Sequence, residues 1–324
     1  MLALAYAFLC LVWSTTWQAI RVCLLGYPPL FGAALRFLFA TVLIAVVCVL
    51  SSLHRREPLS ALWLPRKQHL GILAAGLLNG LGYGCIYVAE QTLSGGTTAI
   101  VCASSPLFTL LAARILGIEP LRIHRLFGLA IGVSGIGAIF WDGLRGSRDH
   151  FQAMLLAGLA AALIWPLYGA LLKRYATGVS ALLSTTYFLF YTALVLFALS
   201  LGQHESFTRF LSAPPAAHLA FLYLTVVGSV LAWSIYLWLL QRLDLSVLST
   251  LGLVQPLLAL ALDLALRETQ LQPRGYVGAA LVLIGMALST QRGGTTPPSS
   301  ATPDPRPGLA PDPGRKRGPD GTAE

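Results

Sequence analysis

The sequence predicts an all-α, polytopic membrane protein, with about ten transmembrane helices that form two inverted five-helix repeats. Of its 324 residues, 56% are hydrophobic and only 11% are charged, which is more apolar surface than a soluble domain of this size could bury. The apolar residues form blocks of about twenty, the length with which a helix crosses roughly 30 Å of hydrocarbon. Several features of the first half also recur in the second half.

About ten blocks have this length and composition, so each is expected to span the membrane. They are residues 2–21, 28–50, 70–90, 97–116, 125–141, 152–172, 180–201, 216–240, 246–266 and 275–290. A transmembrane barrel would instead show shorter segments with alternating polar and apolar residues. The first block lacks a basic leading segment and a small-residue cleavage site, so we expect it to persist as a helix.

The positions of the basic residues predict that both ends of the chain are cytoplasmic. With this topology the inner connections carry Arg55, Arg56, Arg66, Lys67, Arg122, Arg125, Lys173, Arg174 and Arg242, whereas the outer ones carry Arg145, Arg148, Arg209, Arg267 and Arg274. Topology therefore explains most of the net charge of +9, and no nucleic-acid partner is expected. Residues 293–324 are rich in Pro, Gly, Ser and Asp and are predicted to form a disordered cytoplasmic tail.

Matching residues at a nearly constant spacing indicate an internal duplication, with repeats at residues 2–141 and 152–290. The matched pairs are Pro106 with Pro256, Gly128 with Gly278, Gly135 with Gly285, Trp13 with Trp165, Arg21 with Lys173, and Ile86-Tyr87 with Ile235-Tyr236. Because each copy has an odd number of crossings, the second must be inverted relative to the first. Inverted repeats suit alternating access, although a duplication retained only for packing is the alternative.

Three segments resemble the EamA-type family of the drug/metabolite transporter superfamily. They are WSTTWQAIRVCLLGYPPLFGAALRFLFA, YVAEQTLSGGTTAIVCASSPLFTLLAARILGIEPL and QPLLALALDLALRETQL. Ser14 stands where that family often has Gly. The resemblance covers residues 2–290 and implies a ten-helix carrier of the bacterial cytoplasmic (inner) membrane, often an exporter of metabolites or drugs.

Glu90 is the first candidate for transport chemistry, because a carboxylate at the end of a membrane helix is costly if it faces lipid. Gly76, Gly80, Tyr83, Tyr87 and Glu90 lie on one helical stripe, whose glycines favour close contact with another helix. We expect the stripe to face protein and then a polar cavity. A structural ion pair or an interfacial position is the alternative for Glu90.

Arg36 is the obvious charged partner for Glu90, but an arginine at this depth also has the option of extending to the membrane surface. Position 188, which corresponds to Arg36, is Phe, and positions 239 and 240, which correspond to Glu90, are Leu, so the two charges occur in the first repeat only. As a hypothesis, Glu90 takes up a proton or meets a cationic group, and thereby couples transport to the proton gradient.

Aromatic residues are candidates for the walls of a central cavity, where their rings suit an organic or cationic substrate. They are Trp13, Trp17, Trp165, Tyr168, Trp233 and Tyr236. Packing or an interfacial belt explains any single one equally well. Pro106 and Pro256 each remove a backbone donor inside a predicted helix and are candidate hinges.

Two acids close the fourth and ninth predicted helices, and each is followed six residues later by an arginine. The pairs are Glu119 with Arg125 and Glu268 with Arg274. Helix capping or a static ion pair explains them better than a gate.

The sequence argues against an enzyme and for a secondary active transporter. It has no phosphate-binding GK[ST] motif, its histidines are scattered, and its five cysteines show no metal-ligand spacing. No cofactor or metal is expected. The expected partners are a small-molecule substrate, membrane lipid and, as a hypothesis, a coupling proton, and a homodimer is left open. A non-transporting scaffold or a flippase for lipid-linked substrates is the alternative.

Overall fold

The computed structural model describes residues 1–102, 105–115, 117, 127–128, 130–132, 134–135, 138, 148–249, 251–266 and 273–290. This part of the chain folds into helices without a strand, which confirms the predicted all-helical class. Five helical stretches in it are long and apolar enough to cross a membrane: Leu2–Leu24, Pro29–His54, Arg66–Ala89, Ala181–Gly202 and Pro215–Leu240.

The helices of the first half begin close to the predicted positions. They are α1 (Leu2–Leu24), α2 (Pro29–His54), a short 3-10 helix η1 (Leu59–Leu62), α3 (Arg66–Ala89), α4 (Gly95–Cys102) and α5 (Ser105–Ile115). Pro28 and Pro29 set the start of α2, because proline fits the first helical positions, where a backbone amide has no partner. The predicted block 97–116 corresponds to α4 and α5.

In the second half, two of the predicted blocks contain a π-helical turn. The elements are α7 (Arg148–Leu159), the π turn η2 (Ala160–Ile164), α8 (Trp165–Tyr175), α9 (Ala181–Gly202), the 3-10 helix η3 (Arg209–Ser212), α10 (Pro215–Thr225), the π turn η4 (Val226–Leu231), α11 (Ala232–Leu240), α12 (Leu245–Ser249), α13 (Leu251–Leu266) and α14 (Pro273–Thr290). Of block 125–141 only separate residues from 127 to 138 are described, and the predicted tail lies outside the described residues.

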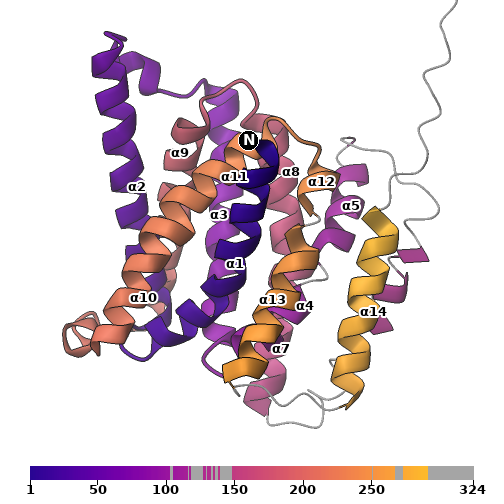
Figure 1. Ribbon diagram of the computed structural model, residues 1–324. Coiled ribbons are helices and arrows are strands. Elements are labelled where there is room, and N and C mark those ends of the chain that lie inside the picture. Colours follow the sequence, from indigo (N-terminus) through magenta and orange to yellow (C-terminus); the bar gives the residue numbers. More distant parts are fainter. Residues whose placement is uncertain are drawn as a thin grey trace, which may run out of the picture. The chain divides into compact units, whose positions relative to one another are not determined.

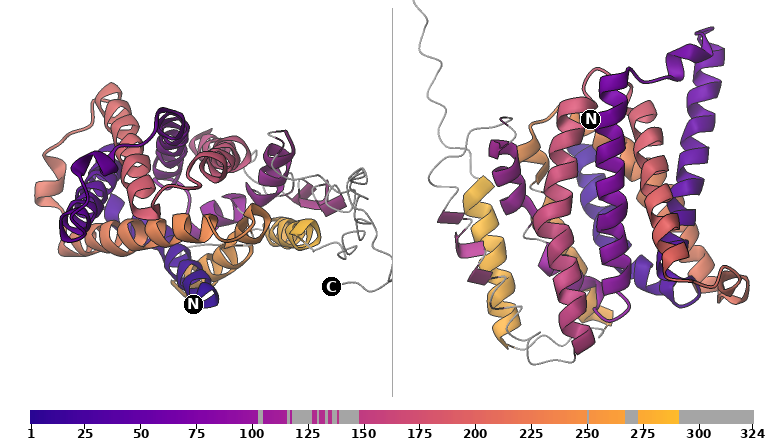
Figure 2. Two further views of the ribbon diagram at one scale, coloured as in Figure 1. Left: turned by 90° about the horizontal axis from the view of Figure 1, so that it is seen from above. Right: turned by 180° about the vertical axis from the view of Figure 1, so that it is seen from behind.

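All of these helices belong to one compact unit, Met1–Gln291. In it, α2 packs on α9, α3 packs on α8 and α9, and α1 packs on α10, α11 and α13. Figures 1 and 2 show α1 and α3 between two groups of helices, α2 with α9 and α10 on one side and α13 with α14 on the other. Elements from both halves of the sequence therefore surround α1 and α3.

The glycines of the α3 stripe make the close contact with α9 that their spacing predicts. A Cβ atom at Gly76 would lie 2.8 Å from the carbonyl oxygen of Phe188, and one at Gly80 would lie 2.9 Å from that of Thr192. At the same interface Nδ2 of Asn79 donates to Oγ1 of Thr192 over 3.0 Å. Small residues thus let the two backbones approach, and one buried hydrogen bond sets their register.

A second glycine contact joins α14 to the helical residues near position 132. A Cβ atom at Gly135 would lie 2.6 Å from the carbonyl oxygen of Gly278, and one at Gly285 would lie 2.5 Å from that of Gly128. The earlier residue of one stretch meets the later residue of the other, so the two helical stretches run antiparallel.

Basic residues bind the carbonyl oxygens at the ends of α3 and α11. Nη1 of Arg21, near the end of α1, donates to the carbonyl oxygens of Glu90 (3.0 Å) and Leu93 beyond α3. Nζ of Lys173, near the end of α8, donates to those of Leu240 (2.6 Å) and Leu243 (2.7 Å) at the end of α11. A cation at these carbonyls satisfies acceptors that the helix leaves unpaired.

The loop after α9 holds the start of α2. The backbone amides of Leu30 and Phe31 donate to the two carboxylate oxygens of Glu205, at 3.0 and 2.7 Å, and Oγ of Ser200 donates to the same carboxylate at 2.8 Å. Beside this cap, the Tyr27 ring stacks on Phe221 with centroids 4.8 Å apart. Burial raises the pKa of the Tyr27 phenol, which shares a hydrogen bond with Nδ1 of His218 at 2.8 Å.

Glu205→Ala is expected to lower the thermal stability of the purified protein, because it removes the acceptor for two helix-terminal amides, a loss worth about 1–2 kcal/mol. The midpoint of thermal unfolding in detergent measures this loss. Glu57→Ala is the control, since Glu57 follows α2 as Glu205 follows α9 but is exposed. Equal midpoints for the two variants would contradict the capping role.

Candidate functional site

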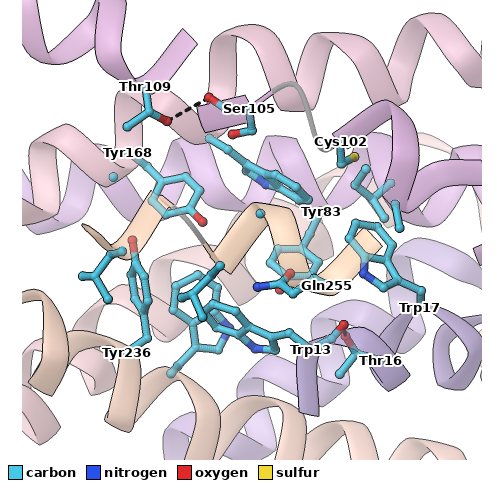
Figure 3. A pocket seen from close by; sticks show the side chains of 18 of the residues that line it. Trp13, Thr16, Trp17, Tyr83, Cys102, Ser105, Thr109, Tyr168, Tyr236 and Gln255 are labelled. Carbon is cyan, nitrogen blue, oxygen red and sulfur yellow. Dashed lines mark hydrogen bonds between the residues drawn. The ribbon is translucent and has the colours of Figure 1, made fainter. Parts of the chain in front are cut away.

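A cavity with a volume of about 150 Å³ lies among helices of both halves, which is room for a small organic molecule. Figure 3 shows aromatic side chains on several sides of it, with Tyr83 and Gln255 near the centre of the view. Its lining residues are Trp13, Thr16, Trp17, Ile20, Arg36, Tyr83, Ile86, Ala99, Cys102, Ser105, Thr109, Trp165, Tyr168, Gly169, Trp233, Tyr236, Leu245, Leu248, Leu251, Gly252 and Gln255.

The aromatic walls form a continuous set of ring contacts. The Trp233 ring is central, with centroid distances of 5.3 Å to Trp13, 5.4 Å to Tyr236 and 6.0 Å to Tyr168. On another side, the rings of Trp17 and Trp165 lie 6.1 Å apart. Tilted contacts of this kind fix the rings, so the cavity is largely preformed.

Arg36 is the one charged residue among the lining residues described, and it is only 1% exposed. Its Nε donates to Oγ of Ser229 (2.8 Å), its Nη1 to the Tyr87 hydroxyl (3.1 Å) and its Nη2 to the carbonyl oxygen of Gly228 (3.3 Å). The guanidinium carbon lies 5.5 Å from the centre of the Tyr83 ring. Arg36 thus ties α2 to α3 and to the π turn η4.

The π turn explains how a helix provides these acceptors to Arg36. Gly228 and Ser229 lie inside η4, and Oγ of Ser229 donates to the carbonyl oxygen of Leu224, five residues earlier, over 2.9 Å. A π turn widens the helix and shifts its backbone hydrogen bonds, so carbonyl oxygens become available to side chains. The second π turn, η2, comes immediately before Trp165, another lining residue.

Several indole groups at the cavity have hydrogen-bonding capacity to spare. Nε1 of Trp13, Trp17 and Trp165 is buried and donates to no acceptor in the described part of the chain. An indole N–H donates only, and buried donors are nearly always paired in folded proteins. The cavity therefore has apolar ring faces, with indole donors buried in its walls.

The structure brings together eight of the ten residues predicted to line a cavity: Arg36, Tyr83, Trp13, Trp17, Trp165, Tyr168, Trp233 and Tyr236. Tyr87 lies behind this lining, 1% exposed, where its hydroxyl meets Arg36. Glu90 is also 1% exposed, and it caps the C-terminal end of α3 without lining the cavity.

Arg36 occupies neither of the two environments expected from the sequence. It is buried, so it does not extend to the membrane surface, and its partners are Ser229, Tyr87 and Gly228 rather than the carboxylate of Glu90. The expectation was wrong because it overlooked acceptors on η4, which is far away in the sequence.

The structure describes only one of the four residues of the predicted helix-end pairs. Glu119, Arg125 and Glu268 lie outside the described residues, whereas Arg274 is exposed in the first turn of α14. Pro106 lies in the first turn of α5 and Pro256 inside α13. The gating and hinge roles of these residues remain predictions.

Sequence reasoning missed the small and polar lining residues. Thr16, Gly169 and Gln255 line the cavity, as do Ser105 and Thr109, whose hydroxyl donates to the carbonyl oxygen of Ser105 over 2.9 Å (Figure 3). The sequence offered one way to find Gly169. When the two halves are aligned through Trp13 and Trp165, Gly169 corresponds to Trp17. A large side chain in one repeat and none in the other marks an asymmetric cavity.

Comparison with known proteins identifies relatives of this chain. The family model described as EamA-like transporter family matches residues 1–141 and 152–291. The chain is 27% identical over 282 residues to an uncharacterized inner membrane transporter, YedA, of Escherichia coli K12, covering 86% of this chain and 87% of that protein. It is 23% identical over 288 residues to an uncharacterized transporter, YoaV, of Bacillus subtilis, covering 86% and 93%.

Two further matches agree with these. A probable amino-acid metabolite efflux pump of Escherichia coli K12 is 22% identical over 286 residues, covering 86% of this chain and 91% of that protein. A crystal structure of a protein matches with a TM-score of 0.64 and 22% identity, covering 89% of this chain and 96% of that one, which shows a shared fold.

Proposed function

This chain belongs to the EamA-like transporter family of inner membrane proteins, and we propose that it exports small organic metabolites or drugs by alternating access. The observation that carries the proposal is the preformed aromatic cavity, which α1 to α5 line together with α8, α11, α12 and α13. A ligand held between two halves becomes accessible from either face when the halves rock against each other. Both the family and the relatives point to a transporter rather than an enzyme.

We propose that the chain forms two inverted repeats, with ten helices and both ends in the cytoplasm. Reciprocal glycine contacts support this arrangement, because Gly135 meets Gly278 as Gly285 meets Gly128. The antiparallel course of these two stretches is what an inverted pair of helices requires. Arg21 and Lys173 likewise close equivalent helix ends.

Alternating access is supported by an asymmetry at repeat-related positions. Glu205 caps the start of α2, whereas Glu57, which follows α2 as Glu205 follows α9, is exposed. One of the two acids is thus engaged and the other is exposed. A carrier that changes the face to which its site opens is expected to exchange such contacts.

Transport in liposomes tests the proposal. Purified protein is reconstituted, and uptake of labelled metabolites is measured with and without the unlabelled compound inside the vesicles. Saturable uptake that counterflow accelerates supports a carrier. Ionic conductance would instead indicate a channel, and the absence of saturable flux for every metabolite tested would count against transport by this protein.

Proton coupling through Glu90 is a separate proposal, supported by the burial of this acid at the end of α3. A buried carboxyl group that binds and releases a proton during transport would make flux depend on pH. Glu90→Gln is expected to flatten the pH dependence of flux in liposomes. Retention of the wild-type pH profile by this variant would exclude coupling at Glu90 and would leave the transport proposal intact.

A further inference from the structure

We propose that the cavity selects small organic carboxylates with an aromatic or apolar body, and that the Arg36 guanidinium receives the carboxylate. This inference rests on the proposed function of the cavity as the transport site and names its ligand class. Three features of the described residues carry it: the net charge of the lining, the N–H groups that Arg36 leaves available, and the indole donors in the cavity walls.

Charge is the first feature. Arg36 is 1% exposed and is the only acidic or basic side chain among the lining residues described. Its partners Ser229, Tyr87 and Gly228 are neutral, so they satisfy its hydrogen bonds without balancing its charge. In the described part of the chain no acidic side chain is bonded to Arg36. Because a buried cation without a counter-ion is costly, an anion entering the cavity relieves that cost.

Geometry is the second feature. A guanidinium has five N–H groups, and the three partners of Arg36 use one on each nitrogen. Nη1 and Nη2 each carry a second N–H that these three bonds do not use, and a carboxylate accepts hydrogen bonds from guanidinium N–H groups.

The third feature is the set of indole donors in the cavity walls. The side chains of Trp13, Trp17 and Trp165 line the cavity, and their buried N–H groups lack acceptors in the described part of the chain. Oxygen acceptors suit such donors, whereas an ammonium group adds further donors. Aromatic rings alone would also accommodate a cation, but Arg36 beside Tyr83 disfavours one.

A carboxylate suits this site better than a phosphate monoester does. A phosphate monoester carries about −1.5 to −2 charges at neutral pH, and Arg36 provides only one compensating charge. A ligand of matched charge leaves a neutral complex in the low-dielectric interior. The small volume and the ring-lined walls favour a compact body that packs against the indoles.

The test compares three compounds of nearly equal size: hydrocinnamate, its uncharged amide and phenylpropylamine. Binding to the full-length wild-type protein in phosphatidylcholine vesicles, which contain no anionic lipid to compete, is followed by the fluorescence of the cavity tryptophans. Hydrocinnamate is expected to bind about tenfold or more tightly than the amide, because it adds a charge-assisted pair, and the amine is expected to bind most weakly. Equal binding of acid and amide, preference for the amine, or no binding of any of the three at millimolar concentration would overturn the proposal.

Arg36→Lys then separates recognition from packing. Lysine keeps the charge but not the paired donors, so the preference for acid over amide is expected to fall toward unity. Arg242→Lys is the matched control, because Arg242 is exposed and does not line the cavity, so the same exchange there should leave the preference unchanged. A loss of packing alone would weaken acid and amide equally in Arg36→Lys, and that result would assign Arg36 a structural role only.

The two proposals fail in different ways. Saturable flux of neutral or cationic compounds without a preference for acids would refute carboxylate recognition and retain the transporter. The absence of saturable flux, with hydrocinnamate still binding tightly, would instead refute transport and retain the site.

Discussion

Gly169→Trp is expected to abolish substrate binding and transport while the protein stays folded. Gly169 lines the cavity, and a Cβ atom at this position meets no other atom within 4 Å. An indole there would fill much of a cavity of about 150 Å³. Trp17, the repeat-related residue, shows that a wall of this cavity accepts the same side chain.

Liposome uptake measures this effect, and the thermal midpoint of the purified protein reports on folding. Gly169→Ala is the size control and is expected to keep most of the flux, since alanine leaves most of the cavity open and favours a helix over glycine by about 1 kcal/mol. Gly202→Trp controls for the added indole, because Gly202 is exposed at the end of α9 with no atom within 4 Å of its Cβ position. Wild-type flux through folded Gly169→Trp would show that substrate does not pass through this cavity.

Local patterns in the sequence predicted the helices well, because each depends on its own apolar length. The block at residues 28–50 became α2, which ends four residues later, and the block at 180–201 became α9, which is shifted by one residue. The π turns η2 and η4 were not predicted. A π turn is stabilised by side chains that bind to it, as Arg36 binds Ser229 in η4. Arg36 is far from η4 in the sequence, so local helix propensity does not predict the turn.

The cavity was predicted less completely, for a related reason. The aromatic lining residues could be predicted, because the alignment of the two halves pairs Trp13 with Trp165 and helical spacing places Tyr83 and Tyr87 on one stripe. In the structure the two tyrosines of this stripe have different surroundings: Tyr83 lines the cavity, whereas the Tyr87 hydroxyl binds Arg36. Which partner a buried charge chooses depends on helix packing, so Glu90 was a reasonable partner for Arg36 in the sequence and not the observed one.

Gly285→Leu is expected to cause the largest loss of stability among single changes in α14. A Cβ atom at Gly285 would clash with the backbone nitrogen of Gly132 and would lie 2.5 Å from the carbonyl oxygen of Gly128. These neighbours are backbone atoms that cannot rotate away, so the helices must separate and lose their packing, at a cost of about 1–3 kcal/mol or more. Size-exclusion chromatography and the thermal midpoint of purified protein measure the result.

Ala280→Leu provides the matched control, because Ala280 is exposed on the same helix and faces away from this contact. Gly135→Leu tests the symmetry, since its Cβ atom would lie 2.6 Å from the carbonyl oxygen of Gly278, the reciprocal contact. If the two stretches are inverted copies about a common axis, Gly135→Leu and Gly285→Leu should lower the midpoint by similar amounts. A large effect at one position and none at the other would show that the contact is not reciprocal, and would weaken the case for inverted repeats.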